Sequence, residues 1–192
     1  MEERADLAAP DRRLAMRLEQ ARHQRGLTLE VLAARSGVSR ATLSRIERAQ
    51  TSPTAAVLGR LCPVFGTTLS QLLQGAEAEP PSLVTAAAAS VWTDPETGFR
   101  RTLVSPPRAG FGVEVMRGEL PGGATIAYPN PPIMNLEHHV LMVAGTLDLE
   151  VEGTVNRLHP GDCLRYRLAG ASRYANPGDA PAIYFVVIRR PS

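Results

Sequence analysis

Residues 27–48 read LTLEVLAARSGVSRATLSRIER and predict two short helices joined by a tight turn. Thr28 and Ser39 are the expected N-caps, because a side-chain hydroxyl at that position accepts a hydrogen bond from a free amide of the first turn. Gly37 suits the residue after the first helix, where the backbone needs a positive φ. The second helix has apolar residues three positions apart, and therefore one face to bury.

The opposite face of this second helix is short, cationic and rich in hydroxyl groups. Such a face, over an apolar inner side, is what a recognition helix needs to enter the major groove of DNA. The simpler alternative is a helical hairpin whose surface only meets solvent. On the DNA-binding interpretation, the candidate contacts are Thr28, Ser39, Arg40, Thr42, Ser44 and Arg45.

A longer pattern, from Leu14 to Leu73, resembles the helix-turn-helix of the xenobiotic-response-element (XRE) regulators, which are relatives of the phage repressors. The resemblance is carried, in order, by residues 25–29, 33–39, 42–48 and 52–54. It implies a five-helix, lambda-repressor-like domain over residues 10–74 that binds double-stranded DNA. One such module covers a short half-site, so a homodimer on a pseudo-palindromic operator is expected.

Residues 75–87 are predicted to be a linker, since Gly75 to Pro81 has the composition of a connecting segment. From Val91 the sequence changes to short β-rich segments separated by Gly, Pro and Asp turns. Strands at that spacing predict a sandwich or small barrel. The clearest expected strands are residues 100–104, 112–116, 146–152 and 182–188.

Residues 88–192 are similar to a cupin, a double-stranded β-helix or jelly-roll barrel. The similarity lies in residues 145–153, 158–162 and 174–178. Cupins usually hold a divalent metal with three histidines and a glutamate. Here the glutamate position is His138 and the late histidine position is Ser172. The other two ligand positions fall on Pro131 and Ile133 or on Pro132 and Met134. The sequence therefore predicts neither a metal nor another cofactor.

The residues in register with the missing metal ligands predict a small-molecule site inside the barrel. The alternative is that their side chains simply fill the core. On the strand after Gly161, Arg165 and Arg167 should face water, which points Tyr166 inward. The candidate ligand-binding residues are Met134, His138, Tyr166, Ser172 and Tyr174.

The sequence contains few signals of catalysis, of disulfide or zinc binding, or of targeting to a membrane. No nucleophile with a base, acid–base pair or metal cluster is visible, so no catalytic residue is assigned and an enzyme is not expected. Cys62 and Cys163 lie far apart without a CxxC motif, which argues against a disulfide framework and a zinc site. A signal-peptide core and an apolar run of membrane-spanning length are both missing, which predicts a cytoplasmic protein with no membrane partner.

The charge is unevenly distributed along the 192 residues. All 21 basic residues are arginine; residues 1–74 hold 11 of them against 7 acids, and residues 75–192 hold 10 against 12. The net charges of +4 and −2 fit a phosphate-facing module joined to a part that does not touch DNA. The expected function is a transcriptional regulator modulated by an unknown small-molecule effector. The alternatives are a regulator whose cupin is only a dimerisation scaffold, and a cupin enzyme.

Overall fold

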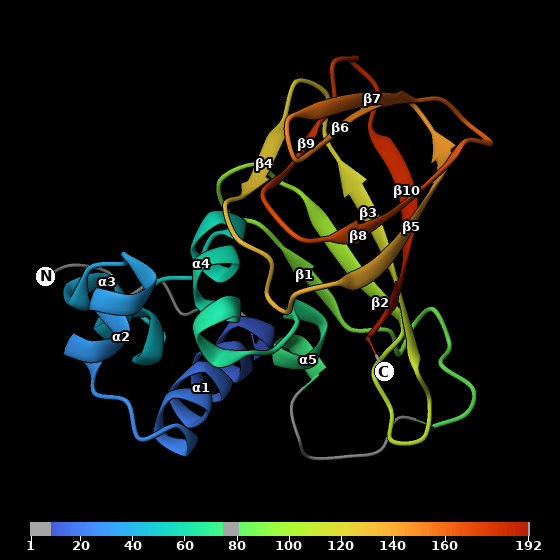
Figure 1. The fold of residues 1–192 in the computed structure, drawn as a ribbon. Coiled ribbons are helices and arrows are strands. Elements are labelled where there is room, and N and C mark those ends of the chain that lie inside the picture. The colour runs from blue at the N-terminus through green and yellow to red at the C-terminus, as the bar shows by residue number, and fades with distance from the viewer. Residues whose placement is uncertain (1–8, 75–80, 192) are drawn as a thin grey trace, which may run out of the picture.

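The computed structural model describes residues 9–74 and 81–191, which form a helical part and a β part packed side by side (Figure 1). In the described residues, five helices precede ten strands. The helices are α1 (Ala9–Gln24), α2 (Leu29–Ser36), α3 (Arg40–Glu47), α4 (Ala55–Phe65) and α5 (Leu69–Gln74). None of these helices is long and apolar enough to cross a membrane.

The ends of α2 and α3 are formed by the residues that the sequence predicts. The Oγ1 atom of Thr28 accepts a hydrogen bond from the Val31 amide at 3.2 Å, and the Oγ atom of Ser39 accepts one from the Thr42 amide at 3.1 Å. Gly37 ends α2 with a φ of 67°. The helix-turn-helix geometry is therefore set by local side-chain chemistry.

The helical part is held together by an apolar core and by one buried ion pair. The Arg22 guanidinium of α1 donates two 2.8 Å hydrogen bonds to the Glu47 carboxylate at the end of α3. Their side chains are 9% and 8% exposed, and Arg22 also donates to the Leu27 carbonyl. This pair fixes the end of α3 against α1. The apolar side chains around it include Leu14, Leu18, Leu32, Leu43 and Ile46.

The β part is a cupin-like sandwich of two antiparallel sheets. One sheet has the order β1-β2-β3-β10-β5-β8 and the other β4-β9-β6-β7. The strands are β1 (Val91–Thr93), β2 (Arg100–Ser105), β3 (Val113–Leu120), β4 (Thr125–Tyr128), β5 (Leu136–Ala144), β6 (Leu147–Val151), β7 (Thr154–Leu158), β8 (Cys163–Leu168), β9 (Ser172–Ala175) and β10 (Ala182–Arg189). The predicted five-helix domain followed by a cupin is confirmed, and so are the four clearest predicted strands.

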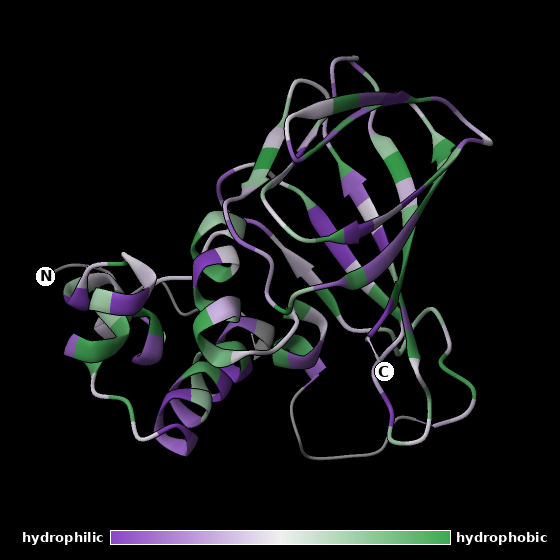
Figure 2. Cartoon of the chain, viewed as in Figure 1, coloured by the Kyte–Doolittle hydropathy of each residue, from purple (hydrophilic) through white to green (hydrophobic). Residues whose placement is uncertain are grey.

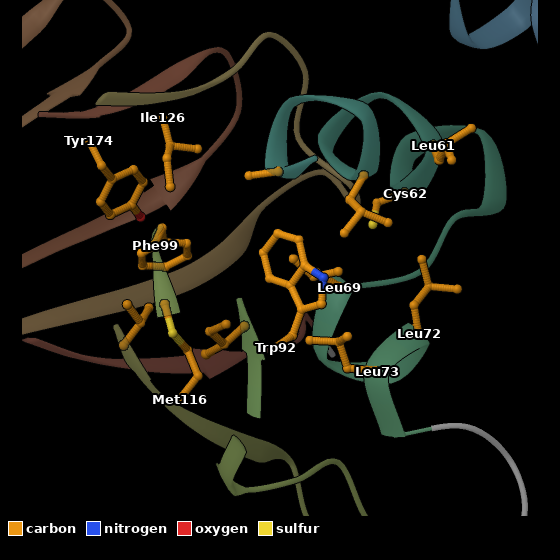
Figure 3. Close-up of a cluster of buried hydrophobic side chains, with 14 of the residues drawn as sticks. Leu61, Cys62, Leu69, Leu72, Leu73, Trp92, Phe99, Met116, Ile126 and Tyr174 are labelled. Carbon is orange, nitrogen blue, oxygen red and sulfur yellow. The ribbon is translucent and has the colours of Figure 1, made fainter. Parts of the chain in front are cut away.

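The two parts share one hydrophobic core. Helices α4 and α5 lie against the sandwich, and their apolar side chains join those of β1 and β2 in a single cluster (Figure 3). Figure 3 shows Trp92 of β1 beside Leu69 of α5, with Phe99 facing the interior of the sandwich. Figure 2 shows hydrophobic residues on α5 and many hydrophilic ones along α1.

This arrangement differs from the expectation that the DNA-binding module lies apart, beyond a linker. Of the predicted linker, residues 75–80 lie outside the described residues, and residues 81–87 contain no helix or strand. The physical reason for the difference is that α4 and α5 carry apolar side chains on two faces. One face packs on the other helices, α4 on α2 and α5 on α1, and the other face is covered by the sandwich.

Candidate functional site: a recognition surface and a cavity between the two parts

Three of the predicted DNA-binding residues, Thr28, Ser39 and Arg40, lie at the N-terminal ends of α2 and α3, and Thr42, Ser44 and Arg45 follow along α3. An ion pair of 2.5 Å between the Arg40 Nε and Glu30 Oε1 atoms shows that the two ends lie side by side. Helix N-termini present free amides and a positive partial charge, which suit phosphate groups. Figure 1 shows α2 and α3 on the side of the helical part that faces away from the sandwich, so this surface stays open.

The six candidates differ in how free their side chains are. Thr28 and Ser39 serve as caps, and the Thr42 hydroxyl lies 2.8 Å from the Ser39 hydroxyl. The Arg45 side chain is exposed and has no partner among the described residues. Arg40 is paired only with the exposed Glu30, and exposed ion pairs are weak enough for a DNA phosphate to replace them. Arg40, Ser44 and Arg45 are therefore the side chains most available for contact.

A cavity of about 80 Å³ lies between the sandwich and helices α4 and α5. This is room for several water molecules or a small organic molecule. The helical part contributes Gly59, Cys62, Thr68 and Leu69 to its wall. The remaining wall comes from the inner faces of the two sheets and from the loop before β5. The helical part and the sandwich thus meet directly at the cavity.

Close packing at Gly59 shows how tightly the two parts fit. A Cβ atom at this position of α4 would lie 2.6 Å from the Cδ1 atom of the Tyr128 ring. Glycine inside a helix costs about 1 kcal/mol relative to alanine. Its presence here is explained by the approach of the Tyr128 ring from the end of β4.

A chain of hydrogen bonds runs along one wall of the cavity. The His138 Nδ1 atom lies 3.1 Å from the Tyr166 hydroxyl, which lies 2.8 Å from the Tyr174 hydroxyl. The Tyr174 ring stacks on that of Tyr184, with 5.8 Å between centroids. The other imidazole nitrogen of His138, Nε2, is buried and has no hydrogen-bond partner in the described residues.

The structure brings together four of the five predicted ligand-binding residues. His138, Ser172 and Tyr174 line the cavity, and Tyr166 supports it by its bonds to His138 and Tyr174. The prediction that Met134 faces inward is wrong, since its side chain is 55% exposed and does not line the cavity. The reason is the backbone: Asn135 has a φ of 60° and β5 begins only at Leu136, so strand alternation from His138 does not extend to Met134.

One cavity residue, Arg101, is not among the predicted site residues. It lies on β2 and is only 7% exposed. A signal was present in the sequence, since Arg101 is two residues before Leu103 and residues two apart on a strand share a face. Because Leu103 is buried, Arg101 also faces the interior.

The cavity residues do not fit the metal site of other cupins. His138 is the sole imidazole among the described lining residues, and Ser172 occupies the position of the late histidine. Within residues 9–74 and 81–191, no three His, Cys, Asp or Glu side chains are grouped so as to hold a metal ion. A single buried imidazole with aromatic neighbours is a poor ligand set for a divalent ion.

Acidification is expected to destabilise the protein through His138. Burial, and then the charges of Arg101 and His139, lower the pKa of His138 from 6.5 to about 4. Between these two pH values the unfolded chain binds a proton that the folded protein does not. The stability from neutral His138 is therefore complete above about pH 6.5 and is lost as the pH falls toward 4, by about 1–3 kcal/mol.

This loss is measured by urea unfolding between pH 7 and pH 4. His138→Gln should flatten the pH dependence in this window, because glutamine does not titrate. The exposed His159→Gln is the matched control and should keep the wild-type slope. Equal slopes for wild type and His138→Gln would rule out this role of His138.

The fold and the two sites define a class: a DNA-binding helix-turn-helix domain packed directly on a cupin-like sandwich. Residues 13–74 match the family described as helix-turn-helix domain. The chain is 29% identical over 178 residues to the HTH-type transcriptional regulator SutR of Escherichia coli K12, covering 93% of this chain and 95% of the relative. It is 37% identical over 65 residues to the HTH-type transcriptional regulator DdrOP3 of Deinococcus deserti, covering 34% of this chain and 50% of that protein.

A solved structure with a similar fold matches nearly the whole chain. An HTH_3 family transcriptional regulator from Vibrio cholerae superposes with a TM-score of 0.76 over 95% of this chain and 97% of that chain, at 21% identity. The chain is thus an HTH-type DNA-binding transcriptional regulator whose C-terminal part has a cupin-like fold. Both relatives are regulators, in agreement with the prediction that the chain is not an enzyme.

Proposed function

We propose that this regulator binds a pseudo-palindromic operator as a homodimer, and that a small molecule in the cavity changes its operator affinity. The observation that carries this proposal is the composition of the cavity wall, which comes from both the DNA-binding part and the sandwich. A molecule in such a cavity contacts both parts at once. It can therefore prefer one of their relative positions, which is the requirement for allosteric control.

Three hydrogen bonds support this coupling, because they cross between the two parts, and two of them involve the cavity residues Thr68 and Arg101. The Asp94 carboxylate accepts from the Ala55 amide at the start of α4 at 3.0 Å. The Thr68 hydroxyl donates to the Glu114 carboxylate at 3.2 Å. The Arg101 guanidinium donates to the Ser70 hydroxyl at 3.0 Å. A change on the sandwich side of the cavity is thus carried to α4 and α5 by fixed bonds.

The outer face of the six-stranded sheet supports the homodimer. Strands β3, β5 and β10 carry apolar side chains there, and Leu141 and Val143 on β5, next to the edge strand β8, are 40% and 48% exposed. Partly exposed Val115, Phe185 and Val187 surround them in register on the neighbouring strands. An apolar patch of this kind is typical of a surface that pairs with another copy. Two copies would supply the two recognition helices that a palindromic operator needs.

Operator binding is tested by Arg45→Ala. An arginine that contacts a guanine contributes about 1–3 kcal/mol of discrimination, so the variant should bind the operator about tenfold to a hundredfold more weakly. Arg157→Ala is the control, because Arg157 is also an exposed arginine but lies on β7, and its replacement should have no effect on operator affinity. The operator is first selected from random duplexes with the full chain, and affinity is measured by fluorescence anisotropy. Unchanged affinity of Arg45→Ala would exclude α3 from specific contact.

The effector is tested by mass spectrometry of whatever small molecule leaves the purified protein on denaturation. Operator affinity is then measured with and without that compound. A change in operator affinity supports the effector function. We place this protein, and therefore this function, in the cytoplasm. If the compound binds without changing operator affinity, the cupin acts only as a dimerisation scaffold.

A further inference from the structure

Arg101 is a buried cation without an anionic partner. Its side chain donates a single hydrogen bond, from Nη2 to the Ser70 hydroxyl, and its Nε atom is buried without a partner. Among the described residues, no Asp or Glu forms an ion pair with it. A buried charge is costly unless it is paired, because it has lost its water without gaining a counter-charge. The cavity beside Arg101 is the place where a counter-charge fits.

A second unsatisfied polar atom belongs to the same cavity. His138 is 9% exposed, and its Nε2 atom has no hydrogen-bond partner. If Tyr174 donates to Tyr166 and Tyr166 donates to His138 Nδ1, the imidazole proton lies on Nε2, which then becomes a donor. The guanidinium and this N–H are then two donors without an acceptor in residues that line the same cavity.

We propose that Arg101 and His138 bind the carboxylate of a small monoanion with a short apolar body. The planar guanidinium fork matches the two oxygens of a carboxylate. Arg101 alone carries a charge among the described lining residues, so one negative charge is balanced and a second is not. The apolar body would lie against Phe99, Met116 and Ile126, which line the same cavity.

This inference rests on the proposed function and specifies its ligand. The Arg101 guanidinium that receives the carboxylate also holds Ser70 of α5, which is 1% exposed at the junction. A ligand that draws the guanidinium toward the cavity changes the bond to α5. The carboxylate site is thus attached to the DNA-binding part by one hydrogen bond.

The experiment compares charged and neutral probes of the same shape on the full-length protein. Propionate and butyrate are titrated against propionamide and butyramide, with thermal unfolding and calorimetry as readouts. At 100-fold its Kd, a carboxylate should raise the Tm by about 5–10 °C, whereas the amides should not. A saturable response to the amides alone, or to none of the four probes, overturns the proposal.

Arg101→Met then tests the residue. Its affinity for the carboxylates should fall about tenfold to a hundredfold, because a hydrogen bond to a charged group is lost. Without ligand its Tm should equal or exceed that of wild type, since the variant removes an unpaired buried charge. Arg157→Met on β7 is the control and should keep wild-type carboxylate binding. Wild-type carboxylate affinity in Arg101→Met overturns the assignment, and so does a lower Tm in the absence of ligand.

Operator binding separates this proposal from the proposed function. If a carboxylate binds through Arg101 but leaves operator affinity unchanged, the site stands and the effector function fails. If a neutral compound from the purified protein changes operator affinity while the carboxylates do not bind, the effector function stands and the carboxylate site fails.

Discussion

Glu47→Ala is expected to lower the free energy of unfolding by about 3–5 kcal/mol, the typical cost of removing one partner of a buried ion pair. Glu47 accepts two 2.8 Å hydrogen bonds from Arg22, and both side chains are more than nine-tenths buried. Without the carboxylate, the guanidinium keeps its bond to the Leu27 carbonyl but remains a buried charge without a counter-charge. The end of α3 also loses its attachment to α1, so operator binding should weaken as well.

The loss is measured by urea unfolding followed by circular dichroism. The double variant Arg22→Met with Glu47→Leu should recover most of the stability, because an apolar pair of similar volume is often as stable as a buried ion pair. Arg157→Ala breaks an exposed pair with Asp148 and should cost less than about 1 kcal/mol. A loss below 1 kcal/mol for Glu47→Ala would contradict the importance of the buried pair.

Asp94→Ala is expected to cost about 2–4 kcal/mol, the sum of a lost helix cap and lost loop bonds. The Asp94 side chain is 1% exposed and accepts hydrogen bonds from the Ala55 amide of α4 and from the amides of Glu96 and Thr97. It also accepts one from the Thr97 hydroxyl. A negative charge at a helix N-terminus is favourable in addition to these bonds.

Because Asp94 belongs to the sandwich and Ala55 to the DNA-binding part, the change should affect both. Thr54→Ala removes only the local cap of α4 and should cost about 1 kcal/mol. Asp94→Asn keeps one acceptor oxygen and should fall between the two. The measurement is thermal and urea unfolding of the three variants. If Asp94→Ala is no less stable than Thr54→Ala, the bond between the two parts contributes nothing.

The parts of the structure that depend on local chemistry could be predicted from the sequence. The caps at Thr28 and Ser39 and the end of α2 at Gly37 depend on residues within a few positions, and all three are confirmed. The inward direction of Tyr166 followed in the same way from its position between two arginines on one strand. Alternation along a strand is a short-range rule, so it holds wherever the strand is unbroken.

The remaining features depend on contacts between distant segments. The positive φ of Asn135 ends the extended backbone just before the start of β5, and the Met134 side chain therefore lies outside the cavity. The cavity itself forms where α4 meets β4, so no single stretch of sequence carries its signature. Strands β4 and β7 were not predicted from the sequence. β4 is only four residues long, and three of the five residues of β7 are exposed without alternation.

The core that runs from α5 into β1 determines how the molecule can be cut and recombined. A fragment ending at Gln74 would leave Cys62, Leu69 and Leu73 without the sandwich side chains that cover them, and would tend to aggregate. A chimaera that joins this helical part to another cupin would need a side chain that fills the space beside Gly59, as the Tyr128 ring of β4 does here. During evolution, such regulators could exchange their sensor domains only with proteins that keep the residues of this junction. The helical part and the sandwich are therefore expected to be inherited together.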